Sequence, residues 1–309
     1  MKRSSRKITV VGAGAVGSTL AMRIAEKGLA DVVLIDILKN IAQAKALDIL
    51  DASTVIGHEQ DIIGTNDYSL IKGSDIVVIT AGLPRKPGMT REELISKNAA
   101  IVKDVAEKVK PNAPDAIVIL VTNPLDTMTY FARKITGFKR ERVLGMAGIL
   151  DSSRFAQLAA AELKVPRSSI KAFMLGSHGD TMVPVLSLTT VSGKPIKEML
   201  KPDVLEKIIM RSRDRGAEIV SLLGTGSAYY SPSASVMPMI EAILNDTKET
   251  LVVSACLDGE YGLKDLAIGI PCKIGKNGIE KIEEIPLTED EKKSFLASAQ
   301  VIKNTIELL

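Results

Sequence analysis

Apolar positions along the first half of the chain follow two different spacings. Five short runs are apolar without alternation, and two longer stretches carry apolar residues at helical spacing. The runs are 8–11, 32–37, 76–80, 117–121 and the shorter 143–145, and the helical stretches are 15–27 and 40–53. Continuous apolar strands are buried on both faces, as in a parallel sheet. Strands that alternate with helices predict an α/β domain built on a doubly wound parallel sheet.

The second half of the chain shows a different order of elements. Helices are predicted at 151–163 and 203–223, strands near 172–175 and 184–191, and antiparallel strands at 251–257, 267–274 and 278–284. Asn277-Gly278 is a strong hairpin-turn signal between the last two strands. Thr288 with Glu291 fits a capping box that opens a C-terminal helix. We expect an α+β substrate domain with antiparallel strands, and we divide the chain into domains 1–145 and 146–309.

The composition is that of a globular protein. Of the 309 residues, 46% are hydrophobic and 25% are charged, with a net charge of +3. That small charge argues against a nucleic-acid surface, and no apolar stretch approaches the roughly eighteen residues that span a membrane. Cys256 and Cys272 fit no metal-binding pattern, so we predict no metal site and two free thiols. We expect a cytoplasmic protein that contacts neither nucleic acid nor membrane.

A glycine-rich turn, Gly12-Ala13-Gly14-Ala15-Val16-Gly17, joins the first predicted strand to the first predicted helix. In this context the pattern predicts a dinucleotide-binding turn in a Rossmann sheet. Gly12 permits the tight turn, Gly14 lets a pyrophosphate approach the backbone, and Gly17 lets the helix pack closely on the strand. Ala15 and Val16 then begin the helix whose N-terminus binds the phosphates.

Asp36 closes the second predicted strand, nineteen positions after Gly17. A carboxylate there accepts hydrogen bonds from the adenosine ribose and repels a 2′-phosphate, which favours NAD over NADP. Ligands of such sheets lie beyond the carboxyl ends of the strands. The strand-end residues that we expect to border NAD are Thr80, Ala81, Gly82, Val121 and Asn123.

Acid–base chemistry is indicated by His178 and by a pair of charged residues, Asp151 and Arg154. Histidine is the natural proton donor and acceptor at neutral pH. Positions three apart share one helix face, so Asp151 can orient the imidazole while Arg154 binds a carboxylate with two parallel hydrogen bonds. The alternatives are a structural histidine, with Asp151 a helix cap and Arg154 its surface partner.

The segment 83–91, Leu-Pro-Arg-Lys-Pro-Gly-Met-Thr-Arg, leaves the predicted cofactor sheet carrying three cations, Arg85, Lys86 and Arg91. Its prolines and glycine predict a jointed loop. Such a loop is either a solvated basic surface or a lid that closes over an anionic substrate.

Together these motifs resemble the lactate/malate dehydrogenase family, and within it the lactate-dehydrogenase-like malate dehydrogenases. The resemblance covers essentially the full length and rests on GAGAVG, Asp36, TAG, LPRKPGMTR, VTNPLD, GILDSSRF and LGSHGD, in the family's order. It implies hydride transfer between NAD and a small 2-hydroxy acid, in a homodimer or a tetramer built from dimers. We also assign Asn98 to the cofactor site.

The resemblance further implies a role for each candidate residue. His178 with Asp151 would form the proton relay, and Arg91 would polarise the reacting carbonyl from the loop. Arg154 would bind the C1 carboxylate of the substrate. Asn123 would form a hydrogen bond near the carbonyl and the nicotinamide.

The choice of substrate depends on Arg85 and Ala228. Malate-type members carry arginine at the first position, where lactate-type members typically carry glutamine. An arginine paired with a second carboxylate is charge-assisted, whereas closure over pyruvate would bury Arg85 unpaired, at roughly 3–5 kcal/mol. Ala228 lies where lactate-type members usually have threonine, and it either leaves room for a larger substrate or is a packing alanine.

The resemblance therefore implies oxidation of the dicarboxylate (S)-malate to oxaloacetate. Two alternatives are a lactate or broader 2-hydroxyacid dehydrogenase and a non-catalytic NAD-binding sensor. Arg85 argues against the first. A sensor would have no need of His178, Asp151, Arg91 and Arg154 together.

Overall fold

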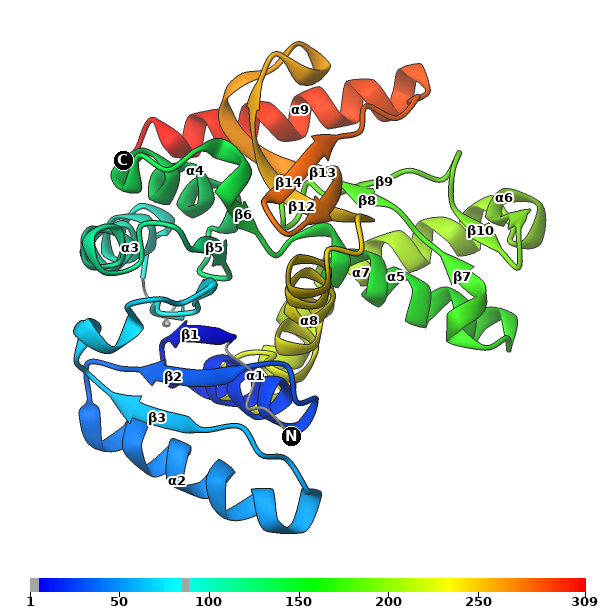
Figure 1. Cartoon of the computed structure of the whole chain (residues 1–309). Helices are drawn as coiled ribbons and strands as arrows, with labels where there is room; N and C mark the ends of the chain where they lie inside the picture. The colour runs from blue at the N-terminus through cyan, green and yellow to red at the C-terminus, as the bar shows by residue number, and fades with distance from the viewer. Residues whose placement is uncertain (1–5, 85–88) are drawn as a thin grey trace.

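The first half of the chain forms a parallel sheet in the computed structural model, which describes residues 6–84 and 89–309 (Figure 1). Its strands are β1 (Lys7–Val11), β2 (Asp31–Ile35), β3 (Ile62–Thr65), β4 (Ile76–Ile79), β5 (Ile117–Leu120) and β6 (Val143–Gly145). They pair in the order β3-β2-β1-β4-β5-β6, all parallel. This is the Rossmann strand order, and it confirms the predicted doubly wound sheet.

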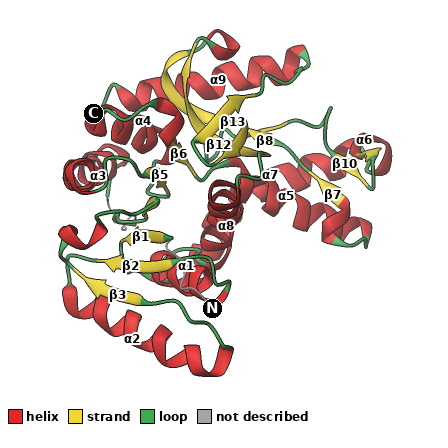
Figure 2. Ribbon diagram, in the orientation of Figure 1, coloured by secondary structure: helices red, strands yellow, loops and turns green. Residues whose placement is uncertain are grey.

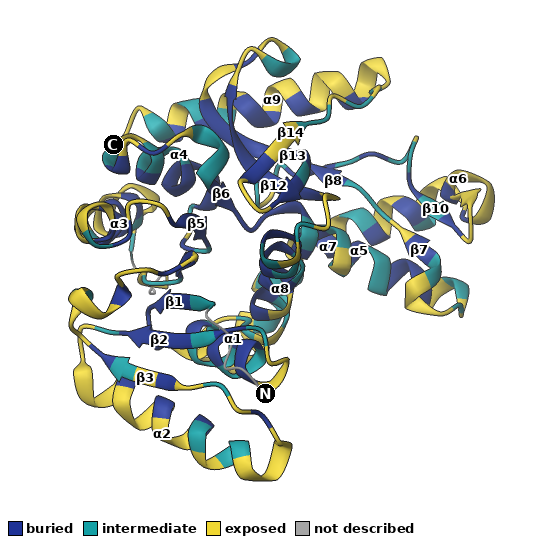
Figure 3. Ribbon diagram, viewed as in Figure 1, coloured by how far each residue is buried: buried dark blue, intermediate teal, exposed yellow. Residues whose placement is uncertain are grey.

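Helices pack on both faces of this sheet (Figure 2). They are α1 (Ala15–Glu26), α2 (Lys39–Ile56), α3 (Arg91–Asn112) and α4 (Leu125–Thr136). Neighbouring residues of a central strand enter different cores: Ile8 and Val10 pack with Leu20 of α1, whereas Val11 packs with Val102 of α3. Figure 3 shows these central strands buried. Burial on both faces explains why the strands are apolar without alternation.

The second half adds antiparallel strands and five helices among the described residues. The strands are β7 (Ile170–Lys171), β8 (Met174–Leu175), β9 (Val183–Pro184), β10 (Thr190–Val191), β11 (Lys194–Pro195), β12 (Glu249–Asp258), β13 (Lys264–Gly275) and β14 (Gly278–Ile282). The helices are α5 (Gly148–Leu163), α6 (Ile196–Met199), α7 (Pro202–Leu223), α8 (Tyr230–Asn245) and α9 (Glu289–Ile306).

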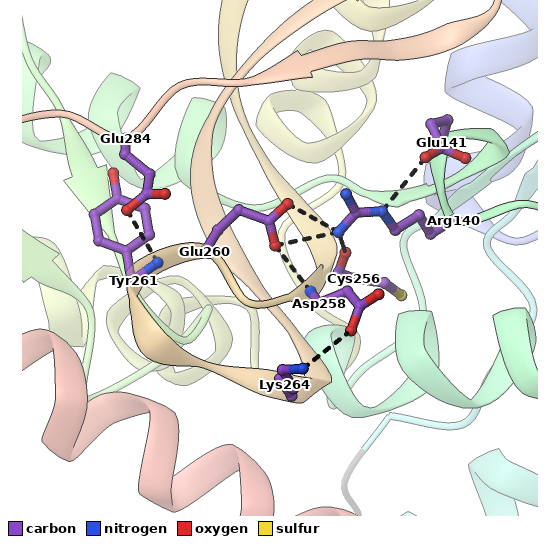
Figure 4. Close-up of polar contacts among 8 residues, drawn as sticks. All are labelled: Arg140, Glu141, Cys256, Asp258, Glu260, Tyr261, Lys264 and Glu284. Atoms are coloured by element: carbon purple, nitrogen blue, oxygen red, sulfur yellow. Dashed lines mark hydrogen bonds and ion pairs between the residues drawn. The ribbon is translucent and has the colours of Figure 1, made fainter.

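The parallel and antiparallel strands belong to one sheet. β12 pairs with β6 in antiparallel fashion and continues into β13 and β14, which gives the order β14-β13-β12-β6-β5-β4-β1-β2-β3. Arg140, just before β6, strengthens this junction: its guanidinium lies 2.9 Å from Glu260 in the β12–β13 turn and 3.4 Å from the Cys256 carbonyl oxygen (Figure 4). The site is therefore built on a continuous sheet.

Several elements differ from the sequence prediction. The strand predicted at 184–191 is wrong, because residues 185–189 form a turn closed by the Thr189 hydroxyl on the Val185 carbonyl oxygen. β3, α3, α4 and α8 were not predicted. Both α3 and α8 contain proline, at Pro111 and Pro238, which obscures a helical pattern. Among the described helices, none combines the length and the apolar character needed to cross a bilayer.

The predicted capping box of the C-terminal helix is confirmed and yields a stability prediction. The Thr288 hydroxyl accepts a hydrogen bond from the Glu291 N–H, and the Glu291 carboxylate accepts one from the Thr288 N–H. Replacing Thr288 with alanine should lower the free energy of unfolding by about 1 kcal/mol. Equilibrium urea unfolding measures this, with the exposed Lys292→Ala in the same helix as the control. Equal stability of Thr288→Ala and wild type would contradict it.

Candidate active site

The turn between β1 and α1 has the shape that a dinucleotide phosphate site requires. Gly12 has a φ of 106°, and a Cβ at Gly17 would lie 1.8 Å from the Gly12 carbonyl oxygen. A Cβ at Gly14 would meet nothing within 4 Å, so the space in front of it is open. Gly14 caps α1 without a side chain, and the first turn, which begins with Ala15 and Val16, carries no acidic residue. The exposed N–H groups therefore fit the pyrophosphate of NAD.

Asp36 and Thr80 hold this turn from the neighbouring strands. Asp36 Oδ2 accepts a hydrogen bond from the Ala13 N–H at 2.8 Å, and Oδ1 accepts one from the Leu38 N–H at 3.0 Å. Thr80 Oγ1 donates to the Gly12 carbonyl oxygen at 3.1 Å. The Asp36 carboxylate thus lies at the end of β2 beside the glycine turn, the position at which a ribose contact is predicted.

Asn98 of α3 joins the ends of β4 and β5. Its side chain is 1% exposed, bonds to both the N–H and the carbonyl oxygen of Leu83, and donates to the Asn123 carbonyl oxygen at 2.7 Å. Asn98 therefore supports the cofactor edge through backbone groups. A Cβ at Gly82 would lie 2.6 Å from Thr122 Cγ2, so the packing of strand ends itself requires this glycine.

The remaining strand-end residues lie at the same edge of the sheet. Ala81 and Val121 are half-buried, and Asn123 is exposed. The Asn123–Pro124 peptide bond is cis. The contacts of Ala81 and Val121 with NAD, and that of Asn123 near the nicotinamide, stay predictions.

His178 and Asp151 form a hydrogen-bonded pair. Asp151 lies in the first turn of α5, and His178 follows β8. The distance from His178 Nδ1 to Asp151 Oδ2 is 2.9 Å. Burial lowers the pKa of His178, but the charge and hydrogen bond of Asp151 raise it more, so the pKa lies above its ordinary value. Because Nδ1 is engaged, Nε2 is the nitrogen that can exchange a proton with a substrate.

Arg154 lies one helical turn beyond Asp151. Its Nη1 is 3.9 Å from Asp151 Oδ1, and its side chain is 13% exposed. Burial lowers the pKa of Arg154, Asp151 raises it and the cation Arg215 lowers it. Its Nε is buried and makes no hydrogen bond to any residue that the structure describes. A buried guanidinium with donors to spare is suited to bind an anion.

In the described part of the chain, the Arg91 side chain contacts α9 and not the group of His178, Asp151 and Arg154. Its Nη2 donates to Thr305 Oγ1 of α9 at 3.4 Å, and within the described ranges no hydrogen bond joins it to His178 or Arg154. The structure thus brings His178, Asp151 and Arg154 together and does not add Arg91 to them.

Three further residues of the sequence can be compared with their places in the structure. Arg85 lies outside the described residues, and Ala228 is half-buried in the segment before α8. The polar neighbours of His58 in the sequence, Glu59, Gln60 and Asp61, favour a solvated residue, but this histidine is 7% exposed, so that interpretation is wrong. The chain turns at Gly57, the left-handed C-cap of α2, and places the next residue inside.

Asp126 is a buried carboxylate that the sequence analysis did not single out. It lies in the first turn of α4 and is 3% exposed. Its Oδ2 accepts a hydrogen bond from the His178 N–H at 2.8 Å, and its Oδ1 accepts one from Ser254 Oγ at 2.7 Å. The sequence signal is weak, because an acid in the first turn of a helix is common.

A dinucleotide turn joined to a histidine–aspartate–arginine group defines the class of an NAD-dependent oxidoreductase. Residues 6–145 match the NAD binding domain of lactate/malate dehydrogenase, and residues 149–309 match the alpha/beta C-terminal domain of the same family. The chain belongs to the lactate/malate dehydrogenase family. The resemblance drawn from the motifs is confirmed.

Individual relatives point the same way. The chain is 49% identical to the malate dehydrogenase of Roseiflexus sp. (strain RS-1) over 98% of both proteins. The structure of Cryptosporidium parvum malate dehydrogenase has a TM-score of 0.96 at 41% identity, covering 98% of both chains. A lactate dehydrogenase of that organism, complexed with lactic acid and NAD, has a TM-score of 0.94 at 40% identity, covering 100% of this chain and 98% of the other. The fold as a whole therefore does not separate malate from lactate enzymes.

The pair of His178 and Asp151 yields a prediction for Asp151→Asn. Without the carboxylate, burial and Arg154 both lower the pKa of His178, so less imidazolium is present at neutral pH. Reduction of a 2-oxo acid should slow by about 10²–10⁴-fold. The rate of reduction falls as pH rises and His178 loses its proton, and in Asp151→Asn this fall should begin at a lower pH than in wild type. A steady-state pH profile measures it. A profile that keeps its wild-type position would contradict the pairing.

Proposed function

We propose that the protein catalyses the reversible NAD-dependent oxidation of (S)-malate to oxaloacetate. The observation that carries the proposal is the buried group of His178, Asp151 and Arg154 at the carboxyl edge of the parallel strands. It places a proton donor beside a cation with unfilled hydrogen-bonding capacity. The identity of 49% to a malate dehydrogenase over nearly the whole length supports the choice of substrate.

Each residue has a distinct task in this reaction. NADH, when bound, supplies the hydride for C2 of oxaloacetate. His178 gives its Nε2 proton to the developing alkoxide oxygen, and in the reverse direction the neutral ring accepts that proton. Asp151 stabilises the imidazolium, Arg154 pairs with the C1 carboxylate, and Arg91 stabilises the charge on the reacting oxygen once its side chain leaves Thr305.

The division at residue 146 is part of the proposal. Residues 1–145 hold the cofactor and residues 146–309 supply the proton donor and Arg154. The matches to two family domains, ending at 145 and beginning at 149, support this boundary. The thiols of Cys256 and Cys272 are free and buried, which supports a reducing, cytoplasmic compartment.

Selectivity for the dicarboxylate is assigned to Arg85, which we propose pairs with the second carboxylate. Arg85→Gln should lower kcat/KM for oxaloacetate sharply while sparing pyruvate, so that the preference for oxaloacetate falls by about two to three powers of ten. The test is an NADH absorbance assay with oxaloacetate and with pyruvate, repeated with NADPH. Lys86→Gln, the neighbouring cation, is the matched control. Unchanged selectivity in Arg85→Gln would refute the assignment, and wild-type preference for pyruvate would refute malate as the substrate.

We also propose that the protein is a homo-oligomer assembled through α2 and α7. Leu47, Val55 and Ile56 of α2 are 62%, 87% and 52% exposed, and Leu222 near the end of α7 is 82% exposed. Exposed large apolar side chains are typical of protein interfaces. A second copy of the chain is the occupant that the family resemblance implies.

The double variant Leu47→Glu, Val55→Glu should therefore have a smaller molar mass than wild type, because it places charge in the interface. Light scattering coupled to size-exclusion chromatography measures this directly. Leu296→Glu on α9, which is 40% exposed in wild type, is the control and should keep the wild-type mass. A wild-type mass for the double variant would exclude the α2 face.

A further inference from the structure

The loop that carries His178 is held at its main chain as well as at its ring. Asp151 binds the ring at Nδ1, while Asp126 accepts the hydrogen bond of the His178 N–H at 2.8 Å. Ser254 of β12, which is fully buried, donates to the other oxygen of Asp126 at 2.7 Å. Both carboxylate oxygens of Asp126 are thus used as acceptors, one by the loop and one by the sheet.

Burying the charge of Asp126 costs free energy that few contacts of this residue offset. Asp126 is 3% exposed, and among the residues that the structure describes no lysine or arginine forms an ion pair with it. The first turn of α4 stabilises a carboxylate only in part, by about 0.3–1 kcal/mol, whereas burying a charge without a partner costs several kcal/mol. The positive charge that stabilises the Asp126 carboxylate is the imidazolium of His178.

Asp126 also connects the two halves of the site. It lies three residues after Asn123, in the segment that leaves β5 at the cofactor edge. Both groups that donate to it, the His178 N–H and the Ser254 hydroxyl, belong to the second half of the chain. A Cβ at Gly145 would lie 3.0 Å from Ser254 Cβ, so β6 and β12 are closely packed beside Ser254. The carboxylate thus fixes the position of the proton donor relative to the nicotinamide edge.

We propose that Asp126, oriented by Ser254, is a positioning residue for proton transfer: it holds the main chain of His178 in place and, as an ionised carboxylate, favours the imidazolium together with Asp151. The proposal rests on the proposed role of His178 as proton donor. Asp126 does not touch the substrate, so its effect is transmitted through His178.

The electrostatic part follows from the charged groups around the ring. Asp151 and Arg154 of α5 and Asp126 of α4 face His178. Asp151 and Asp126 raise its pKa, and burial and Arg154 lower it. The pKa of Asp126 itself lies above its ordinary value, because burial raises it more than the hydrogen bonds from Ser254 and the His178 N–H and the charge of His178 lower it. Removing the charge of Asp126 therefore shifts the balance at His178 towards the neutral ring.

Asp126→Asn separates charge from shape. The amide oxygen still accepts from the His178 N–H, and the amide N–H group donates to Ser254 Oγ, so the variant keeps the packing and loses the charge. We expect kcat for oxaloacetate reduction to fall about 10- to 100-fold, with KM and NADH affinity unchanged. The pKa of His178 should fall. NMR titration of ¹³C-labelled histidine measures it without turnover, because the chain has only two histidines.

Two variants distinguish positioning from general support of the loop. Ser254→Ala keeps the carboxylate, so kcat should fall by less and the His178 titration should stay near the wild-type position. Ser298→Ala on α9 is the matched control, because Ser298 accepts the hydrogen bond of the neighbouring Ser177 N–H at 2.8 Å without carrying charge. It should leave the titration in place. Thermal unfolding of each variant reports whether the fold is retained.

Wild-type kcat and an unshifted His178 titration in Asp126→Asn would overturn the proposal. A shift of equal size in Ser298→Ala would overturn it as well, because loosening the loop would then account for the effect. His178→Asn should be inactive while still binding NADH. If it reduces oxaloacetate at the wild-type rate, the proposed function fails; if it is inactive and Asp126→Asn behaves as wild type, only the role of Asp126 fails.

Discussion

The site depends on one buried carboxylate, that of Asp151, held between two groups that carry or acquire positive charge. Its side chain is 4% exposed, and it lies 2.9 Å from His178 Nδ1 and 3.9 Å from Arg154 Nη1. A buried carboxylate without such partners would cost several kcal/mol. The surrounding structure must therefore keep the histidine loop and the arginine within a few ångströms of one helix turn. The same constraint prepares the chemistry, since it makes the ring a proton donor and leaves guanidinium N–H groups of Arg154 able to bind an anion.

The fold meets this constraint through close packing between α5 and the strands beside it. α5 begins directly after β6, and a Cβ at Gly148 would lie 2.4 Å from the Met174 carbonyl oxygen, so the helix start lies against β8. The Ser152 hydroxyl accepts the Met174 N–H at 3.1 Å. Two backbone hydrogen bonds between Gly176 and Gly269 then attach the histidine loop to β13. The acid and its carboxylate are thus fixed by a sheet that extends from the cofactor strands into the second half of the chain.

The sequence predicts these features unevenly, for physical reasons. Central strands such as β1 and β4 are buried on both faces, and their unbroken apolar runs identify them. β3 was missed because it is a short edge strand with partly exposed residues and a glycine, Gly64, that its approach to Ala42 requires. His178, Asp151 and Arg154 could be predicted because they lie in motifs, GILDSSRF and LGSHGD, that resemble those of the lactate/malate dehydrogenase family. Their local patterns alone also fit a structural histidine, a helix cap and a surface arginine. The buried position of His58, the contact of Arg91 with Thr305 and the role of Asp126 depend on tertiary packing, which no local pattern reports.

The central claim is tested most directly by a crystal structure of the protein with NADH and a dicarboxylate analogue that cannot be reduced. The account predicts that one carboxylate of the analogue lies on Arg154, and that the oxygen replacing the reacting carbonyl lies about 2.6–3.2 Å from His178 Nε2. An analogue that binds away from Arg154, or a histidine whose ring has left Asp151 in the complex, would contradict it.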